Sequence, residues 1–391
     1  MAAIRTEITE IVTGLAMLGF RDLDEALLVR PMSVVNLTTE HYERLDAARR
    51  AGTHTSEFET AWENGRIFAR ADDGLRGRPP WTVEWKGPHK PPGYEQVPAD
   101  LRVDHVYLVS CKYGSSILHN VSPSHLFDRS LAERRVERGS DWFLTTAPDD
   151  YQQVYEACIA DTGILGLPPM VADLEKADRQ ALKAALPKRG RLPDGSQQAY
   201  ERFSMAVASA SAARWNASLG TARQRESMLW RLLRLQAAPY FVLGATTAGD
   251  PLRYRVGTPW DFRSRFELRS FEAWPEAAGQ PMVRWRAEVI ERAQAASAEV
   301  ANAERPAGEP GDGQPRLELL ADTSSESEMT DSTETAVPAE AAEAAEPAEV
   351  PIAIEGHVEI RWTHGRFSGA PEAKVHLDTH PHQVPGYFPI T

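Results

Sequence analysis

The sequence predicts a mixed α+β or α/β protein with an N-terminal mixed sheet flanked by helices and a C-terminal α+β domain containing an antiparallel sheet. Apolar residues recur at spacings of three and four over the first 70 residues, which is typical of amphipathic helices. From residue 81 onward, short alternating segments separated by turn residues indicate strands. The length of 391 residues is enough for two or three domains of ~150 residues each.

The first 165 residues are expected to alternate between helices and strands. Helices are predicted at 4–18, 38–50 and 56–70, followed by strands at 81–87 and 103–114. Ser122 and Pro123 have the pattern of a helix start, so a helix is predicted to run to Arg138. A strand at 141–148 and a further helix complete the pattern. We therefore expect a helical segment at 1–55 and a core at 56–165.

The second half is expected to be an antiparallel domain reached through a connection. Residues 166–196 carry Pro, Lys and Gly and predict a connection with one short helix, and residues 197–236 predict a long helical region. Strand-like segments follow at 239–244, 252–256, 262–274, 281–290, 357–367 and 373–380. These segments define a domain at 197–290 plus 351–391.

The net charge is confined to one segment. The formal charge is −13, and residues 291–355 hold 16 acidic and 3 basic residues, whereas the other 326 residues hold 40 of each. Residues 291–350 are rich in Ala, Glu, Pro, Ser and Thr, a composition that predicts a disordered insertion. Because the remainder is neutral, overall acidity does not exclude a nucleic-acid partner.

Cysteine content and hydropathy argue against a disulfide-stabilised protein and against a membrane-spanning one. Cys111 and Cys158 are the two cysteines, which excludes a disulfide scaffold. No apolar run approaches the ~18 residues of a membrane span, and charges interrupt the apolar N-terminus. We expect a cytoplasmic protein without membrane contact.

The pattern with the clearest chemical meaning lies at 103–114. Asp104 opens an apolar segment, and Ser110 and Lys112 close it, while Glu84 lies on the preceding predicted strand. A buried lysine needs a nearby carboxylate, because an unpaired charge is costly to bury. Carboxylates with a lysine can hold Mg²⁺ and a water against a phosphodiester, so the segment predicts a metal-dependent hydrolytic site.

This order of elements resembles the PD-(D/E)xK nuclease superfamily, specifically its restriction-endonuclease-like members. The order is a helix, a strand, an apolar strand with an acid and a lysine, and then a second helix. The resemblance covers about residues 55–150. It implies that Asp104 or Glu84 binds metal, that Lys112 orients the attacking water, and that Glu63 or Glu59 takes the place of the first-helix acid. Ser110 stands where the family has its second carboxylate, so the resemblance assigns the missing oxygen ligand to the following helix, which offers Asp128 and Glu133, or to Glu84, with Ser110 lining the site.

Three other patterns compete for the site. Glu84-x-Lys86 is itself an acid–lysine pair on a strand, although Lys86 is expected to be an exposed residue at the strand end. Cys111 could act as a nucleophile with His105 or His119, although it faces away from the side on which Lys112 lies. Late histidines, with His380-Pro-His382 the tightest pair, could bind zinc or be ordinary surface residues.

Arginines of the second domain recur at even spacings, which places each set on one face of its strand. The predicted DNA-contacting residues are Arg253, Arg255, Arg263, Arg265, Arg284 and Arg286, with Arg269 in the same pattern. Such a face can neutralise phosphates, although a solvated face with cross-strand ion pairs has the same pattern.

The sequence therefore predicts an Mg²⁺-dependent DNA endonuclease of restriction-like type, and the resemblance implies a role in cell defence. Its expected partner is double-stranded DNA, and cutting both strands with one site per chain favours a homodimer. Two alternatives stay open: a nuclease-fold protein that binds DNA without cutting, motivated by Ser110, and a binding module for something other than nucleic acid.

Overall fold

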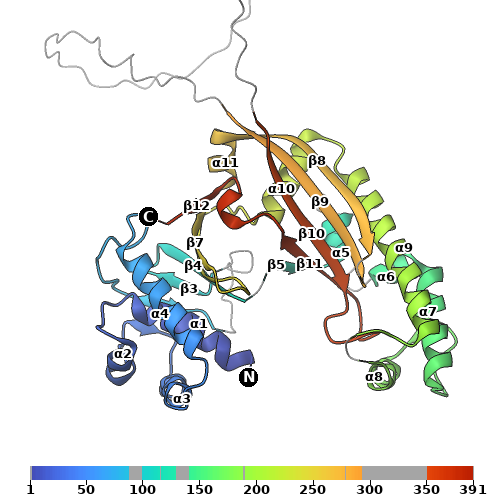
Figure 1. Ribbon diagram of the computed structural model, residues 1–391, viewed down its shortest axis with the longest axis horizontal. Helices are drawn as coiled ribbons and strands as arrows, with labels where there is room; N and C mark the ends of the chain where they lie inside the picture. Colours follow the sequence, from blue (N-terminus) through green and yellow to red (C-terminus); the bar gives the residue numbers. More distant parts are fainter. Residues whose placement is uncertain are drawn as a thin grey trace, which may run out of the picture. The chain divides into compact units, whose positions relative to one another are not determined.

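The strands form two sheets with helices packed on them, which confirms the α+β class (Figure 1). The computed structural model describes residues 2–87, 99–114, 116–128, 141–187, 190–277, 279–292 and 350–390. Residues 293–349 of the insertion expected at 291–350, and most of the helix expected to run to Arg138, lie outside these residues. All described strands belong to one unit, Met1–Arg292 with Pro351–Thr391.

The described helices and strands have the following bounds. The α-helices are α1 (Ala2–Ala16), α2 (Leu23–Val29), α3 (Thr39–Arg50), α4 (Thr55–Arg70), α5 (Pro123–Phe127), α6 (Trp142–Thr146), α7 (Pro148–Thr162), α8 (Lys176–Ala185), α9 (Asp194–Ser218), α10 (Ala222–Leu232) and α11 (Pro259–Arg265). The strands are β1 (Val34–Val35), β2 (Val83–Trp85), β3 (Leu101–Val103), β4 (Tyr107–Tyr113), β5 (Ile117–Val121), β6 (Tyr240–Ala245), β7 (Pro251–Val256), β8 (Phe266–Ala277), β9 (Pro281–Glu291), β10 (Ile352–Arg361), β11 (Glu372–Leu377) and β12 (Tyr387–Pro389).

The first sheet is mixed and has seven strands in the order β1-β2-β3-β4-β6-β7-β12. β2, β3 and β4 form an antiparallel meander, and β4 then pairs in parallel with β6. Helices α1 and α4 lie together and cover one face. Gly65 of α4 allows this packing, because a Cβ there would collide with the carbonyl oxygen of Thr13 and the methyl group of Ala16 on α1.

The second sheet is antiparallel and has five strands in the order β5-β11-β10-β9-β8. On β9 and β10, buried residues alternate with more exposed ones. The apolar face, with Trp285, Ile354 and Val358 fully buried, belongs to the larger core that also contains Phe203 and Trp215 of α9. The opposite face is left polar.

Several strands join sheets across the domain boundaries expected from the sequence. β6, β7 and β12, which were expected in the C-terminal domain, complete the sheet that β2, β3 and β4 begin. Conversely, β5 from the expected nuclease-like core forms an edge of the five-stranded sheet. The expected connection at 166–196 contains α8, as predicted, and a short 3-10 helix at Val171–Asp173.

The strand predicted at 103–114 is instead the second half of a hairpin. Asp104 and His105 both have positive φ, 50° and 60°, and with Val106 they connect β3 to β4. Asp tolerates this left-handed conformation because its short side chain bonds locally. A single strand starting at Asp104 was therefore the wrong prediction.

Two further strand predictions were wrong because local helix starts override the apolar pattern. Asp141 caps α6 by accepting a hydrogen bond from the Phe143 N–H, and both Trp142 and Phe143 are buried, which an alternating strand does not allow. At residues 262–265 the chain is still in α11, which begins with a capping box between Thr258 and Asp261. The helical region at 197–236 is divided into α9 and α10.

None of the described helices is long and apolar enough to cross a membrane.

Candidate functional site

Asp104 lies at the opposite end of β4 from Lys112. Tyr107 pairs with Val103 beside the turn, and Lys112 follows five residues later, which is ~17 Å along a strand. The Asp104 carboxylate accepts hydrogen bonds from the Trp81 and Thr82 N–H groups at 2.6 and 3.0 Å and pairs with Arg78. Burial opposes its charge, but these partners outweigh burial and lower its pKa. Asp104 therefore fixes the hairpin turn.

Glu84 lies on β2 within an ion-pair network. Its carboxylate accepts a hydrogen bond from Lys86 Nζ at 2.8 Å and one from Arg102 Nε at 2.7 Å. Burial works against the charged form, but the two cations outweigh it, and the pKa of Glu84 is lowered. The Lys86 side chain is only 2% exposed, so the expectation of an exposed end-of-strand lysine was wrong.

The two supporting carboxylates each form an ion pair with an arginine. Glu63 extends from α4 with 63% of its side chain exposed and pairs with Arg253 at 3.1 Å. Asp128 follows α5 and pairs with Arg214 of α9 at 3.1 Å. The four predicted acids, Asp104, Glu84, Glu63 and Asp128, thus pair with different cations, and Glu84 pairs with two.

Asp100, at the start of β3, is the acid that the fold brings to the Ser110–Lys112 strand. Its carboxylate accepts a hydrogen bond from the Cys111 N–H at 2.6 Å, and Ser110 Oγ lies 3.3 Å away. Ser110 is buried, and Lys112 follows it by two residues on the same face of β4. Sequence reasoning missed Asp100 because the hairpin between β3 and β4 was not recognised.

Cys111 faces the other side of β4 and packs against the core formed with α1 to α4. Burial raises the pKa of its thiol well above the usual value, and the negative charges of Asp100 and Glu10 act in the same direction. Glu10 itself is buried on α1, where it accepts a hydrogen bond from Trp85 Nε1 at 2.7 Å. The thiol is thus held protonated, which does not favour a nucleophile.

Lys112 also lines an open cavity of about 840 Å³ whose charged walls are cationic. Arg231 and Arg234, from the C-terminal end of α10, line it together with Trp230 and residues of β5. None of its described lining residues is acidic. Burial lowers the pKa of Arg231, which shows that its charge is poorly solvated. The cavity is therefore suited to an anion.

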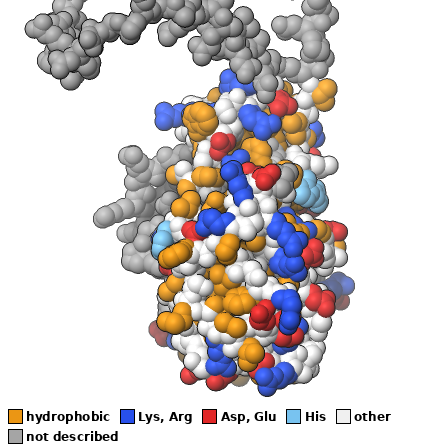
Figure 2. Space-filling model, turned by 90° about the vertical axis from the view of Figure 1, so that its left-hand side faces the viewer, with side chains coloured by type: hydrophobic (Ala, Val, Ile, Leu, Met, Phe, Trp, Pro, Cys, Tyr) orange, Lys and Arg blue, Asp and Glu red, His pale blue; other side chains and the backbone are white. Residues whose placement is uncertain are grey.

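The predicted DNA-contacting arginines do not share one face. Arg253 and Arg255 are on β7 of the seven-stranded sheet, Arg284 and Arg286 are on β9 of the five-stranded sheet, and Arg263 and Arg265 are on α11. Five of the six pair with carboxylates, and Arg255 stacks on Phe388. On the face shown in Figure 2, cationic and acidic side chains are interspersed. A single Arg-rich sheet face was the wrong expectation.

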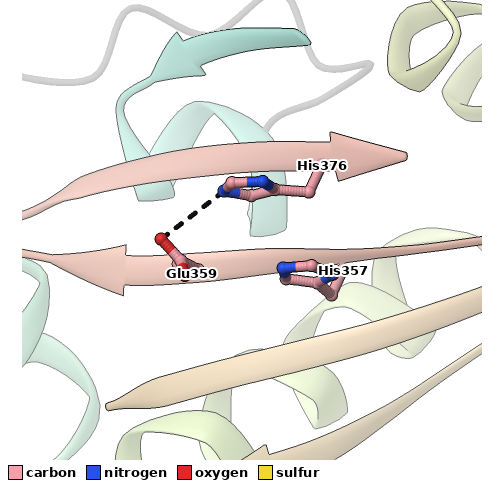
Figure 3. A group of neighbouring side chains, drawn as sticks. All are labelled: His357, Glu359 and His376. Atoms are coloured by element: carbon pink, nitrogen blue, oxygen red, sulfur yellow. Dashed lines mark ion pairs between the residues drawn. The ribbon is translucent and has the colours of Figure 1, made fainter. Parts of the chain in front are cut away.

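A second chemically distinct group lies on the polar face of the five-stranded sheet. Among the described residues, one group of potential metal ligands comes together, and it consists of His357, Glu359 and His376 (Figure 3). The sequence pointed to late histidines but favoured His380 and His382. The even spacing of His357 and Glu359 is a sequence signal that they share one face of a strand. The pairing of His357 with His376 is visible only in the structure.

No protein-family model, characterised protein or solved structure matches the chain.

Proposed function

We propose that the protein is an Mg²⁺-dependent nuclease acting on double-stranded DNA, with Asp100, Ser110 and Lys112 at its centre. The observation that carries the proposal is the contact of Asp100 with β4 directly beside Ser110, two residues before Lys112. This arrangement replaces Asp104 and Glu84 with Asp100 as the acid of the site.

The strand order supports the proposal. A helix precedes an antiparallel meander of three strands, and the last of these pairs in parallel with a fourth strand reached through further helices. This order agrees with the helix and strand succession on which the resemblance to restriction-endonuclease-like proteins rests. The acid lies directly before β3 and the lysine lies on β4, its neighbour in the meander.

The oxygen atoms at the site fit the ion that the proposal requires. Mg²⁺ in proteins is held by one or two carboxylates with waters and substrate phosphates, and Asp100 with Ser110 provides one carboxylate and one hydroxyl group. When bound, the ion would lower the pKa of a water and neutralise charge on the phosphate. Lys112 would orient that water, and Arg231 and Arg234 would bind the phosphate backbone through the cavity.

Ser110 favours a second candidate function, which is DNA binding without cleavage. Ser110 puts a hydroxyl group at the position, two residues before Lys112, where the resemblance implies a carboxylate, and Asp100 contacts this position from the neighbouring chain segment. The same cationic cavity would then hold the DNA backbone without hydrolysis. A cleavage assay and a binding assay together distinguish the two functions.

Plasmid cleavage tests the proposal with four proteins: the wild type, Asp100→Asn, Lys112→Ala and Asp104→Asn. We expect cleavage in Mg²⁺ that stops in EDTA and falls by about 10²–10³-fold in the first two variants, the usual loss when a transition-state stabilising group is removed. Asp104→Asn is the matched control, because Asp104 lies at the far end of β4 and should leave the rate within about threefold.

The possible outcomes separate the alternatives. Cleavage that persists in Lys112→Ala would overturn the site assignment. Salt-sensitive duplex binding without cleavage, weakened by Arg231→Ala and Arg234→Ala, would support the binding protein. If neither cleavage nor low-salt binding is observed, a partner other than nucleic acid is indicated.

A further inference from the structure

We propose that His357, Glu359 and His376 form a binding site for a divalent transition-metal ion of the zinc type, separate from the Mg²⁺ site proposed above. His357 and Glu359 project from β10 and His376 from the adjacent β11, all on the polar face of the five-stranded sheet (Figure 3). One donor atom from each residue lies within 4.8 Å of the others.

The donor spacing fits a tetrahedral ion. His376 Nε2 lies 3.4 Å from Glu359 Oε2. Two ligand atoms each about 2.0–2.1 Å from a tetrahedral zinc ion are about 3.3 Å apart, so this pair already has the required separation. Both atoms are buried, and their contacts are ion pairs, with each other at 3.4 Å and from Glu359 Oε2 to Arg361 Nη1 at 3.0 Å, without a well-aligned hydrogen bond among the described residues. Two buried polar atoms directed at one point are what a metal ion would satisfy.

The outer contacts orient both imidazoles for binding through Nε2. His357 Nδ1 lies 2.8 Å from an Asp378 carboxylate oxygen, and His376 Nδ1 lies 3.1 Å from Ser116 Oγ. Metal-binding histidines usually donate their other ring N–H to a carboxylate or similar acceptor, which fixes the tautomer. The two rings are parallel, with centroids 4.5 Å apart. The two imidazoles are therefore oriented by the residue before β5 and the residue after β11.

The ligand types determine which ion fits. Imidazole nitrogens favour zinc-like transition metals, whereas Mg²⁺ favours oxygen. Two histidines and one glutamate leave one coordination position for water or an anion, as in open zinc sites. Arg361 Nη1 lies 3.0 Å from Glu359 Oε2, so the ion would compete with this arginine. Two further cations lie beside the group. Lys374 is paired with Glu359 in the ladder between β10 and β11, and Arg284 forms an ion pair with Asp378.

Zinc titration of the full chain, first freed of metal with a chelator, tests the site. Calorimetry and elemental analysis after gel filtration should give one Zn²⁺ per chain, and excess Mg²⁺ should not displace it. Glu359→Gln and His376→Gln should lower the affinity at least 10-fold, and Asp378→Asn by about 10–100-fold. Arg361→Gln should leave the affinity unchanged or increase it, because it removes the competing cation.

Control variants make the result decisive. A double substitution of His380 and His382 to Ala removes the exposed histidine pair and should leave binding intact. Visible absorption of the Co²⁺-loaded protein should be intense, as for tetrahedral sites, and should disappear in Glu359→Gln, which keeps the side-chain shape. Sub-stoichiometric zinc, or equal loss in the His380/His382 variant, would overturn the proposal, and circular dichroism confirms that each variant is folded.

Discussion

At the residue scale, the fold and not the order along the chain determines which acidic residue contacts the strand that carries Ser110 and Lys112. Asp104 precedes Lys112 in a run of apolar residues, yet its carboxylate holds the turn through Arg78 and two backbone N–H groups. Asp100 is further away in sequence and lies beside Ser110. The difference arises because the hairpin reverses the chain between the two acids.

His119 gives a pH prediction at the same scale. Burial and the positive charges of Arg234, Arg231 and Lys112 lower the pKa of His119 from 6.5 to about 3. The folded protein therefore excludes a proton that the unfolded chain binds below pH 6.5. The contribution of neutral His119 to the free energy of unfolding is fully present above pH 6.5, and it is lost as the pH falls toward 3.

Urea denaturation between pH 7 and pH 5 measures this effect. We expect the free energy of unfolding to fall with pH by up to about 1.4 kcal/mol per unit from this one proton. His119→Gln should flatten the slope, whereas His382→Gln, at an exposed position, should leave it unchanged. An identical slope in His119→Gln would show that His119 is protonated in the folded state.

At the scale of elements, the site depends on the parallel pairing of β4 with β6. Lys112 pairs with Gly244, and Asn64, which is fully buried on α4, donates a hydrogen bond to the Gly244 carbonyl oxygen at 3.1 Å. A Cβ at Gly244 would collide with the backbone carbonyl of Lys112. The absence of a side chain therefore allows the two strands to approach.

Gly244→Ala should consequently separate the strands at Lys112. We expect it to lower the free energy of unfolding by about 1–3 kcal/mol, the usual cost of overpacking, and to reduce any Lys112-dependent activity. Gly220→Ala is the control, because the nearest heavy atom to its added Cβ would be 4.0 Å away. Denaturant unfolding compares the two, and equal stability would show that β4 and β6 adjust without cost.

At the scale of the whole molecule, the acidic segment leaves and re-enters the fold at neighbouring strands. β9 ends at Glu291 and β10 begins at Ile352, and Val289 pairs with Ile352 across the antiparallel ladder. A short turn can therefore connect the two strands in place of the segment.

Deletion of residues 300–350 should leave the fold intact. It removes 13 acidic residues and two arginines, so the formal charge changes from −13 to −2. We expect the melting temperature to stay within a few degrees, and duplex binding at low salt to become tighter because anionic charge is lost. Circular dichroism and a gel-shift assay measure both, and loss of a cooperative transition would show that the segment stabilises the fold.

The sequence by itself determined the α+β class, the amphipathic N-terminal helices, strands such as β2, β6 and β9, and Ser110 and Lys112 as candidate site residues. The period of the apolar residues and the residues that begin a helix depend on neighbours along the chain, so the sequence alone can predict these elements. The −13 charge was also located by sequence alone, in a segment that lies mostly outside the residues that the structure describes.

Tertiary structure alone decided which residues meet. It brought Asp100 to Ser110, placed Arg231 and Arg234 in one cavity with Lys112, divided the predicted DNA-contacting arginines among two sheets and α11, and paired His357 with His376. The physical reason is that strand pairing joins segments separated by up to hundreds of residues. Turn geometry and register determine those pairings, and a one-residue shift would move every side chain to the other face.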